Sequence, residues 1–143
     1  REAEAFVFHT RLAHISSAMK EKNATRALER MSLMTQGVGG GTRIGECVAT
    51  FNKWHAKRVL NSRSCVMILS DGYDTGAPDF LASELKRLRQ RCRRIAWLNP
   101  MMGWDGYRPD AKAMQAALPY LDLFAPAHNL ESLEALEPYL ARL

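Results

Sequence analysis

Two oxygen-bearing side chains, Thr42 and Asp71, stand where the sequence pattern changes from one element to the next. Thr42 ends a glycine-rich stretch, and Asp71 comes two residues after the apolar run Cys65–Leu69. Hydroxyl and carboxylate oxygens are hard ligands that suit Mg²⁺, which keeps several of its waters when it binds a protein. These two residues are therefore the candidate metal ligands of the sequence.

Each candidate ligand also has a local structural interpretation. Threonine is a common N-cap, so the Thr42 hydroxyl can bond an amide in the first turn of a following helix. Aspartate often bonds the main chain of the turn after a strand, which would account for Asp71. Capping and metal coordination do not exclude one another, so both interpretations stay open.

The glycine-rich stretch from Gly37 to Gly41 permits a different chemistry. Glycines before a helix expose amides that can hold a phosphate, as in a nucleotide- or phosphate-binding α/β enzyme. This stretch, however, lacks a lysine at the P-loop position and does not follow a predicted strand. Hydrolysis has little support, because no nucleophile elbow surrounds Ser70 and the histidines are scattered. We expect a protein that binds rather than an enzyme, without catalytic or cofactor-binding residues other than the metal ligands.

Strands and helices that the apolar pattern predicts must position these residues. Continuous apolar runs are typical of parallel strands buried on both faces, here Ala5–Phe8, Cys65–Leu69, Ile95–Leu98 and Leu121–Ala125. A short edge strand is expected from Leu12 to Ile15. Helical stripes lie between and after the strands, with starts near Asn23, Ile44, Pro78, Ala113 and Asn129. This alternation predicts a single α/β domain over residues 1–143, with a mostly parallel sheet and helices on both faces.

The composition is that of a globular chain and narrows the class of protein. No apolar run is long enough to span a membrane, and the start does not resemble a signal peptide. Cys47, Cys65 and Cys92 lack metal-type spacing and are expected to be reduced core thiols of a cytoplasmic protein. Six basic residues crowd between Lys86 and Arg94, but no aromatic residues or recognition motif accompany them. We therefore expect a solvated helix face there and no nucleic-acid partner.

Three stretches, taken in their order and spacing, resemble a known family. They are Gly40-Gly41-Thr42-Arg43-Ile44-Gly45, Val66-Met67-Ile68-Leu69-Ser70-Asp71-Gly72-Tyr73-Asp74 and Ala96-Trp97-Leu98-Asn99-Pro100. They resemble the CoxE-like branch of von Willebrand factor type A (VWA) domains, and the resemblance covers nearly the whole chain. It implies a Rossmann-like three-layer sandwich with a metal-ion-dependent adhesion site (MIDAS) at the carboxyl edge of the sheet. Thr42 and Asp71 match two of the three ligand elements of that site.

The third ligand element, an Asp-x-Ser-x-Ser motif after the family's first strand, is absent from this sequence. Because the chain also begins with Arg1, we expect it to be N-terminally truncated relative to the family rather than a divergent, metal-free VWA domain. Up to three oxygen ligands are then missing, so Mg²⁺ or Mn²⁺ is expected to bind weakly or not at all. In the family the first strand lies mid-sheet, between the strands that match Ala5–Phe8 and Cys65–Leu69. These two strands must then pair directly, borrow a strand or expose unpaired edges.

The resemblance also implies a function. CoxE-like proteins are associated with the maturation of carbon monoxide dehydrogenase, and related VWA proteins often act with a MoxR-type AAA+ ATPase. The expected function is a metal-assisted protein-interaction module that docks a protein client, in which a partner carboxylate completes the metal coordination.

Overall fold

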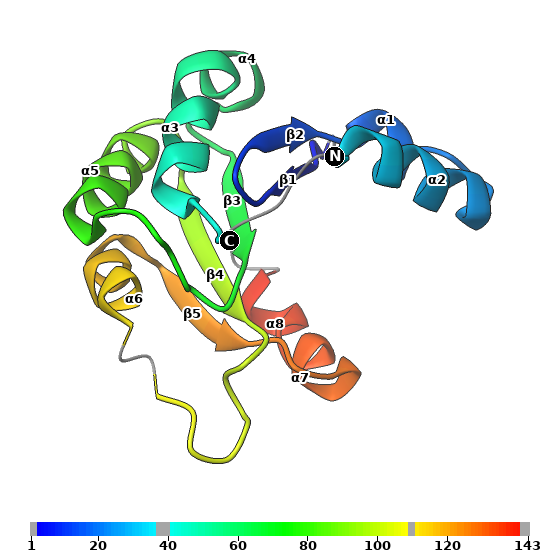
Figure 1. Ribbon diagram of the computed structural model, residues 1–143. Helices are drawn as coiled ribbons and strands as arrows, with labels where there is room; N and C mark the ends of the chain where they lie inside the picture. Colours follow the sequence, from blue (N-terminus) through cyan, green and yellow to red (C-terminus); the bar gives the residue numbers. More distant parts are fainter. Residues whose placement is uncertain (1–2, 37–40, 109–110, 141–143) are drawn as a thin grey trace.

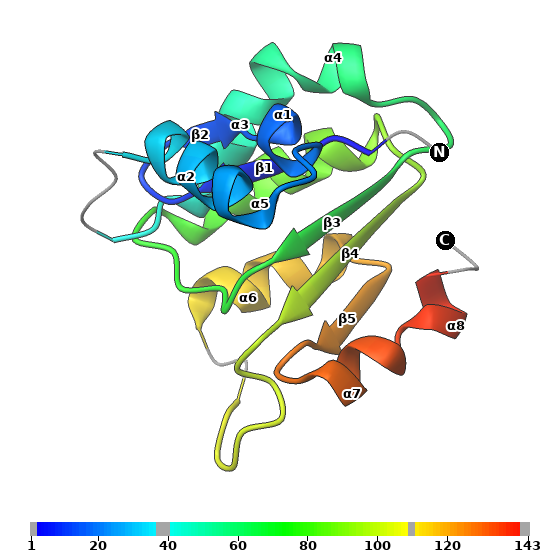
Figure 2. The same ribbon diagram turned by 90° about the vertical axis from the view of Figure 1, so that its right-hand side faces the viewer.

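The computed structural model describes residues 3–36, 41–108 and 111–140, and it has an α/β architecture (Figures 1 and 2). Residues 37–40 of the glycine-rich stretch lie outside the described residues. The elements in chain order are β1 (Phe6–Phe8), β2 (Leu12–His14), α1 (Ser16–Met19), α2 (Ala24–Met34), α3 (Ile44–Trp54), α4 (Ala56–Val59), β3 (Cys65–Leu69), α5 (Pro78–Arg89), β4 (Arg94–Asn99), α6 (Lys112–Ala117), a 3-10 turn (Leu118–Tyr120), β5 (Leu123–Pro126), α7 (Leu130–Glu134) and α8 (Glu137–Leu140).

The main sheet contains three parallel strands in the order β3-β4-β5. Val66 lies opposite Ile95 in the first pair, and Leu98 lies opposite Ala125 in the second. β4 is the central strand, and its residues from Ile95 onward are almost fully buried. The prediction of parallel strands at these three places is confirmed, although β5 begins at Leu123 rather than Leu121.

Three helices, α3, α5 and α6, cover one face of the main sheet (Figure 1). Leu81 and Leu85 of α5 pack with Trp97 of β4 in one buried cluster. α5 begins at Pro78, as expected from the preference of proline for the first helical turn. The apolar stripe predicted for this helix is therefore its core-facing side.

The opposite face of the sheet is covered only in part. α7 and α8 lie on this side (Figure 1), where Leu136 packs with Leu98 and Ala125. β3 lacks such cover, so Met67 is 49% exposed and Leu69 is 60% exposed. Helices thus lie on both faces of the sheet, but they leave one face of β3 open.

The prediction that β3 is buried on both faces is wrong. Its side chains alternate between exposed and less exposed positions, and only Ile68 is buried. Cys65 is exposed for the same reason and is not a core thiol, whereas Cys47 and Cys92 are buried as expected. β3 is one of the two edge strands of its sheet, and an apolar run alone does not show what lies beside a strand.

β1 does not join the main sheet. It pairs antiparallel with β2 in a separate two-stranded sheet, with Val7 opposite Ala13. The prediction that Ala5–Phe8 is a parallel strand of one sheet is therefore wrong, whereas the short strand beside it is confirmed. The connection explains the pairing: it is only three residues long, with the His9 amide donating to the Arg11 carbonyl, and such a short turn permits only an antiparallel neighbour.

Helices α1 and α2 form an arm that projects from the body of the protein (Figure 1). Asn23 caps α2 as expected, because its side chain accepts a hydrogen bond from the Arg26 amide. α2 buries no residue, and Leu28 of its predicted apolar stripe is 64% exposed, so this stripe does not pack into the core. Among the helices that the structure describes, none has the length and apolar character needed to cross a membrane.

The basic stretch at the end of α5 has partners within the protein. Arg87 pairs with Glu84 at 2.9 Å, and the Arg91 guanidinium donates to the Asn52 carbonyl at 2.9 Å. Arginines 89 and 94 both pair with Asp122. These side chains remain largely exposed, as expected of a solvated face. They also bond partners on α3, on α5 itself and at Asp122, just before β5.

Candidate functional site

A groove lies between the edges of β1 and β3 and reaches the carboxyl end of the main sheet. Its volume is about 490 Å³. The lining residues are Phe6, Val7, Phe8, Thr42, Met67, Leu69, Ser70, Asp71, Pro100 and Met101. Both candidate ligands therefore line the same groove, beside the apolar side chains of two strands that do not pair with one another. We expected these strands to pair directly, to borrow a strand or to expose unpaired edges, and in the described residues their facing edges are unpaired.

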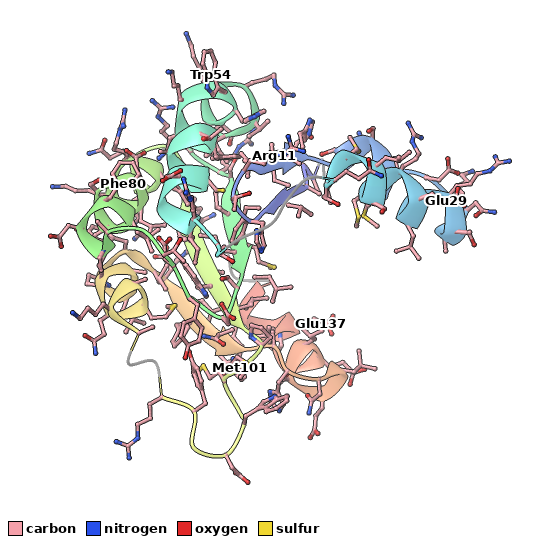
Figure 3. All side chains as sticks on the ribbon, viewed as in Figure 1. Arg11, Glu29, Trp54, Phe80, Met101 and Glu137 are labelled. Atoms are coloured by element: carbon pink, nitrogen blue, oxygen red, sulfur yellow. The ribbon has the colours of Figure 1, made fainter. Side chains whose placement is uncertain are left out.

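The main chain at the carboxyl end of β3 is held by two side chains of β4. Trp97 Nε1 donates to the Ser70 carbonyl at 2.9 Å, and Asn99 Nδ2 donates to the Asp71 carbonyl at 3.2 Å. Asn99 Oδ1 in turn accepts from the amide of Met101, which Figure 3 labels, at 2.8 Å. Since Trp97 and Asn99 are both fully buried, they hold this end of the strand in one position.

The turn after β3 uses both of its first polar side chains. Ser70 Oγ accepts from the Gly72 amide at 3.1 Å, and Asp71 Oδ1 accepts from the Tyr73 amide at 3.0 Å. Gly72 has a φ of +84°, and a Cβ there would lie 2.3 Å from Met114 Sδ, so the turn requires glycine. Through Oδ1, Asp71 therefore bonds the main chain of the turn, as its local structural interpretation predicts. Its Oδ2 has no hydrogen-bond partner among the described residues.

The same turn grips the start of α3. Asp74 accepts from the Ile44 amide through Oδ1 and from the Gly45 amide through Oδ2, each at 3.0 Å. Thr75 donates to the Thr42 carbonyl from its amide at 2.9 Å and from Oγ1 at 3.0 Å. We refer to Asp74 and Thr75 as the clasp. It joins the two segments that carry the candidate ligands.

The clasp contradicts the N-cap interpretation of Thr42 and weakens the phosphate-loop interpretation. The interpretation of Thr42 as an N-cap is wrong, because Arg43 takes the N-cap position without a side-chain hydrogen bond and Asp74 bonds the first-turn amides. These amides are also the donors that a phosphate would need at the start of α3. A carboxylate already occupies them, which counts against the phosphate-loop interpretation. The greater part of that loop, residues 37–40, lies outside the described residues.

Sequence reasoning missed four residues that position the site: Asp74, Thr75, Trp97 and Asn99. The nearest signal was a second carboxylate after the glycine in Asp71-Gly72-Tyr73-Asp74. Asp74 caps a helix whose first residue lies 30 positions earlier, so no local pattern connects the two. The hydrogen bonds from β4 likewise depend on strand pairing, which a one-dimensional pattern does not specify.

The donor set fits a hard divalent cation in its chemistry but supplies few ligands. A threonine hydroxyl and a carboxylate are oxygen ligands of the type that Mg²⁺ takes. The described residues contain no group of three or more His, Cys, Asp or Glu side chains that could hold an ion. Two protein oxygens would leave about four of the six positions around Mg²⁺ for water or for a partner. The two residues would therefore fill about a third of the coordination positions around Mg²⁺.

One buried thiol lies near the start of α3. Cys47 is 2% exposed, and its Sγ lies 3.6 Å from the His9 carbonyl oxygen. Burial raises the pKa of Cys47 to about 11. The thiol is therefore protonated at neutral pH and is poorly suited to act as a nucleophile.

Comparisons with known proteins give one match. No curated protein and no solved structure matches the chain. The sequence model of one family, described as VWA domain containing CoxE-like protein, matches residues 1–133. This match covers most of the 143 residues and includes every residue of the groove and the clasp. The chain therefore belongs to the family of VWA domain containing CoxE-like proteins.

Proposed function

We propose that this chain is a metal-assisted protein-interaction module. Thr42 and Asp71 each supply an oxygen ligand to Mg²⁺ or Mn²⁺, and a carboxylate of the protein partner supplies another. A hard cation prefers an acidic oxygen from the partner, so one contact provides both orientation and specificity.

The observation that carries this proposal is the shared groove. The Thr42 and Asp71 side chains line it together, although 28 residues separate them in the sequence. Hydrogen bonds from the buried side chains of Trp97 and Asn99 hold the main chain at Ser70 and Asp71, and Thr75 holds the carbonyl of Thr42. Such preorganisation reduces the ordering cost of binding.

The rest of the groove suits an apolar partner segment. Val7 of β1 and Met67 and Leu69 of β3 are 38%, 49% and 60% exposed, and they lie along the groove. At about 25 cal/mol per Å² of apolar surface, covering such side chains contributes to affinity. The expected partner segment carries a carboxylate at the Asp71 end and apolar side chains beyond it.

The family suggests what this interaction serves. We propose that the chain is an accessory factor that acts with a MoxR-type AAA+ ATPase on a protein client, such as a metalloenzyme of the carbon monoxide dehydrogenase type. Binding of the purified ATPase should require Mg²⁺ and should fall with EDTA or with Asp71→Ala. Binding that is equal with Mg²⁺ and with EDTA would count against a metal-assisted contact.

The metal site itself is tested by NMR of the ¹⁵N-labelled protein with Mn²⁺. Paramagnetic broadening detects weak sites, which two protein ligands predict. Broadening should centre on residues next to Thr42 and Asp71, and it should disappear in Thr42→Ala and Asp71→Ala. Glu29→Ala is the matched control, because it removes a carboxylate on α2, where Figure 3 shows Glu29 on the projecting arm. Broadening that is unaffected by Asp71→Ala, or is lost equally in the control, would refute the site.

A further inference from the structure

Asp74 lies at the point where the candidate metal site meets the start of α3. Each of its carboxylate oxygens accepts a first-turn amide of α3, and Oδ1 also accepts from the Gly76 amide at 2.9 Å. Three main-chain donors thus converge on one carboxylate, which satisfies it without a metal. Among the described residues α3 has no cap of its own. Asp74 is therefore a cap supplied from the other candidate loop.

The sign of the charge at this place matters for ion binding. The start of an α-helix carries about half a positive charge, so free amides there favour an anion and oppose a nearby cation. Thr42 comes two residues before the first residue of α3, so a cation held by its hydroxyl would lie close to that positive end. The Asp74 carboxylate offsets the positive charge and occupies the amides that an anion would bind.

Close packing keeps Asp74 and the α3 start together. A Cβ at Gly41 would lie 2.3 Å from Thr75 Cγ2, and one at Gly45 would lie 3.1 Å from the ring of Phe80. The two segments approach so closely that larger side chains would force them apart. Hydrogen bonds from Thr75 to the Thr42 carbonyl add to this contact.

We propose that Asp74 is the positioning residue that makes this edge of the sheet selective for a cation and closed to anions. The part of this inference that concerns cations rests on the proposed metal site. The part that concerns anions stands on the hydrogen bonds of Asp74 alone. Asp74 acts through the amides of α3 and through the placement of Thr42, and it does not itself contact the ion.

The test compares Mn²⁺ and inorganic phosphate on the same ¹⁵N-labelled protein. In the wild type, Mn²⁺ broadens signals near Thr42 and Asp71, and phosphate leaves the Ile44 and Gly45 amide shifts unchanged. In Asp74→Ala, Mn²⁺ binding should weaken by about two- to five-fold or more, the range expected for a charge at a helix terminus. Phosphate should then shift the Ile44 and Gly45 amide signals.

Three further variants separate selectivity from simple damage to the fold. Asp74→Asn keeps the side-chain shape and replaces Asp74→Ala in the test if that variant does not fold. Its Mn²⁺ affinity should also be lower than that of the wild type. Thr75→Val removes one hydrogen bond of the clasp without a change in charge, so it should gain no phosphate response. Glu29→Ala changes the charge equally on the distant arm and should alter neither ion.

The outcomes distinguish failure of the inference from failure of the proposed function. If the wild type binds Mn²⁺ and Asp74→Ala and Asp74→Asn bind it equally well, the inference is wrong and Asp74 is only structural. The same holds if Asp74→Ala loses Mn²⁺ without gaining a phosphate response. If the wild type shows no Mn²⁺ effect while Asp74→Ala gains phosphate binding, the metal site is wrong and the exclusion of anions by Asp74 stands.

Discussion

The buried hydrogen bonds between α3 and α5 lead to a quantitative prediction. Asn52 is 3% exposed, and its Nδ2 donates to Glu84 Oε2 at 2.8 Å and to the Glu84 carbonyl at 2.9 Å. The Glu84 side chain is 5% exposed, and its other carboxylate oxygen accepts from Arg87 at 2.9 Å. The pair joins the helix that begins at the candidate site to the helix at the centre of the core.

The perturbation is Asn52→Leu, which leaves one carboxylate oxygen of Glu84 buried without its amide donor. Hydrogen bonds to charged groups contribute about 1.5–3 kcal/mol, and a buried group left without a partner is costly to the folded state. We expect the free energy of unfolding to fall by about 2–3 kcal/mol. Domains of this kind have total stabilities of about 5–15 kcal/mol, so the loss should be conspicuous. At about 3–4 °C per kcal/mol, Tm should fall by roughly 10 °C.

The assay is urea unfolding of four proteins that form a double-mutant cycle: the wild type, Asn52→Leu, Glu84→Met and the double variant. Replacing both partners by apolar groups removes the unsatisfied oxygen, so the double variant should be at least about 1 kcal/mol more stable than the sum of the single losses predicts. Gln115→Ala is the control, since Gln115 is an exposed amide on α6 and should change stability by less than about 0.5 kcal/mol. Single losses that add within about 0.5 kcal/mol would refute the coupling.

Three further predictions follow from individual side chains. Burial opposes ionisation of Asp122, but hydrogen bonds from Arg89 and a main-chain amide, with nearby arginine charges, hold its pKa below the usual value. The ionised Asp122 therefore stabilises the fold above its unfolded-state pKa, and this stabilisation is lost as the pH falls. In urea unfolding below about pH 4, the unfolding free energy of the wild type should fall more steeply with pH than that of Asp122→Asn. Equal pH dependence of the two proteins would contradict this. The exposed Cys65 should be the one thiol of three that reacts promptly with Ellman's reagent in the native protein, and rapid reaction of a second thiol would count against the described burial. Trp97→Phe removes the buried donor to the end of β3 and should lower the unfolding free energy by about 1–3 kcal/mol, whereas an unchanged urea midpoint would show that this hydrogen bond adds little.

The sequence predicted the local elements well where the cause of an element is itself local. Asn23 and Asn129 both cap helices through hydrogen bonds to amides three residues later, and Pro78 opens α5. The predicted stripe of α5 faces the core because a period of 3.6 residues marks one side of a helix. The continuous apolar run Cys65–Leu69 likewise marked a strand with Asp71 beyond its end, although the expected burial of both its faces was wrong.

The sequence by itself also determined which side chains are candidate oxygen ligands, because Thr42, Asp71 and the motifs around them can be identified without coordinates. Only the tertiary structure decided that β1 leaves the main sheet, that one face of β3 stays open and that Asp74 caps α3. β1 pairs with β2, its neighbour in the sequence, but the open face of β3 and the cap on α3 depend on segments far apart in the chain. A strand edge or a polar side chain bonds whichever partner the folded chain places beside it. Apolar periodicity shows that a surface will be buried, but it does not show which segment will bury it.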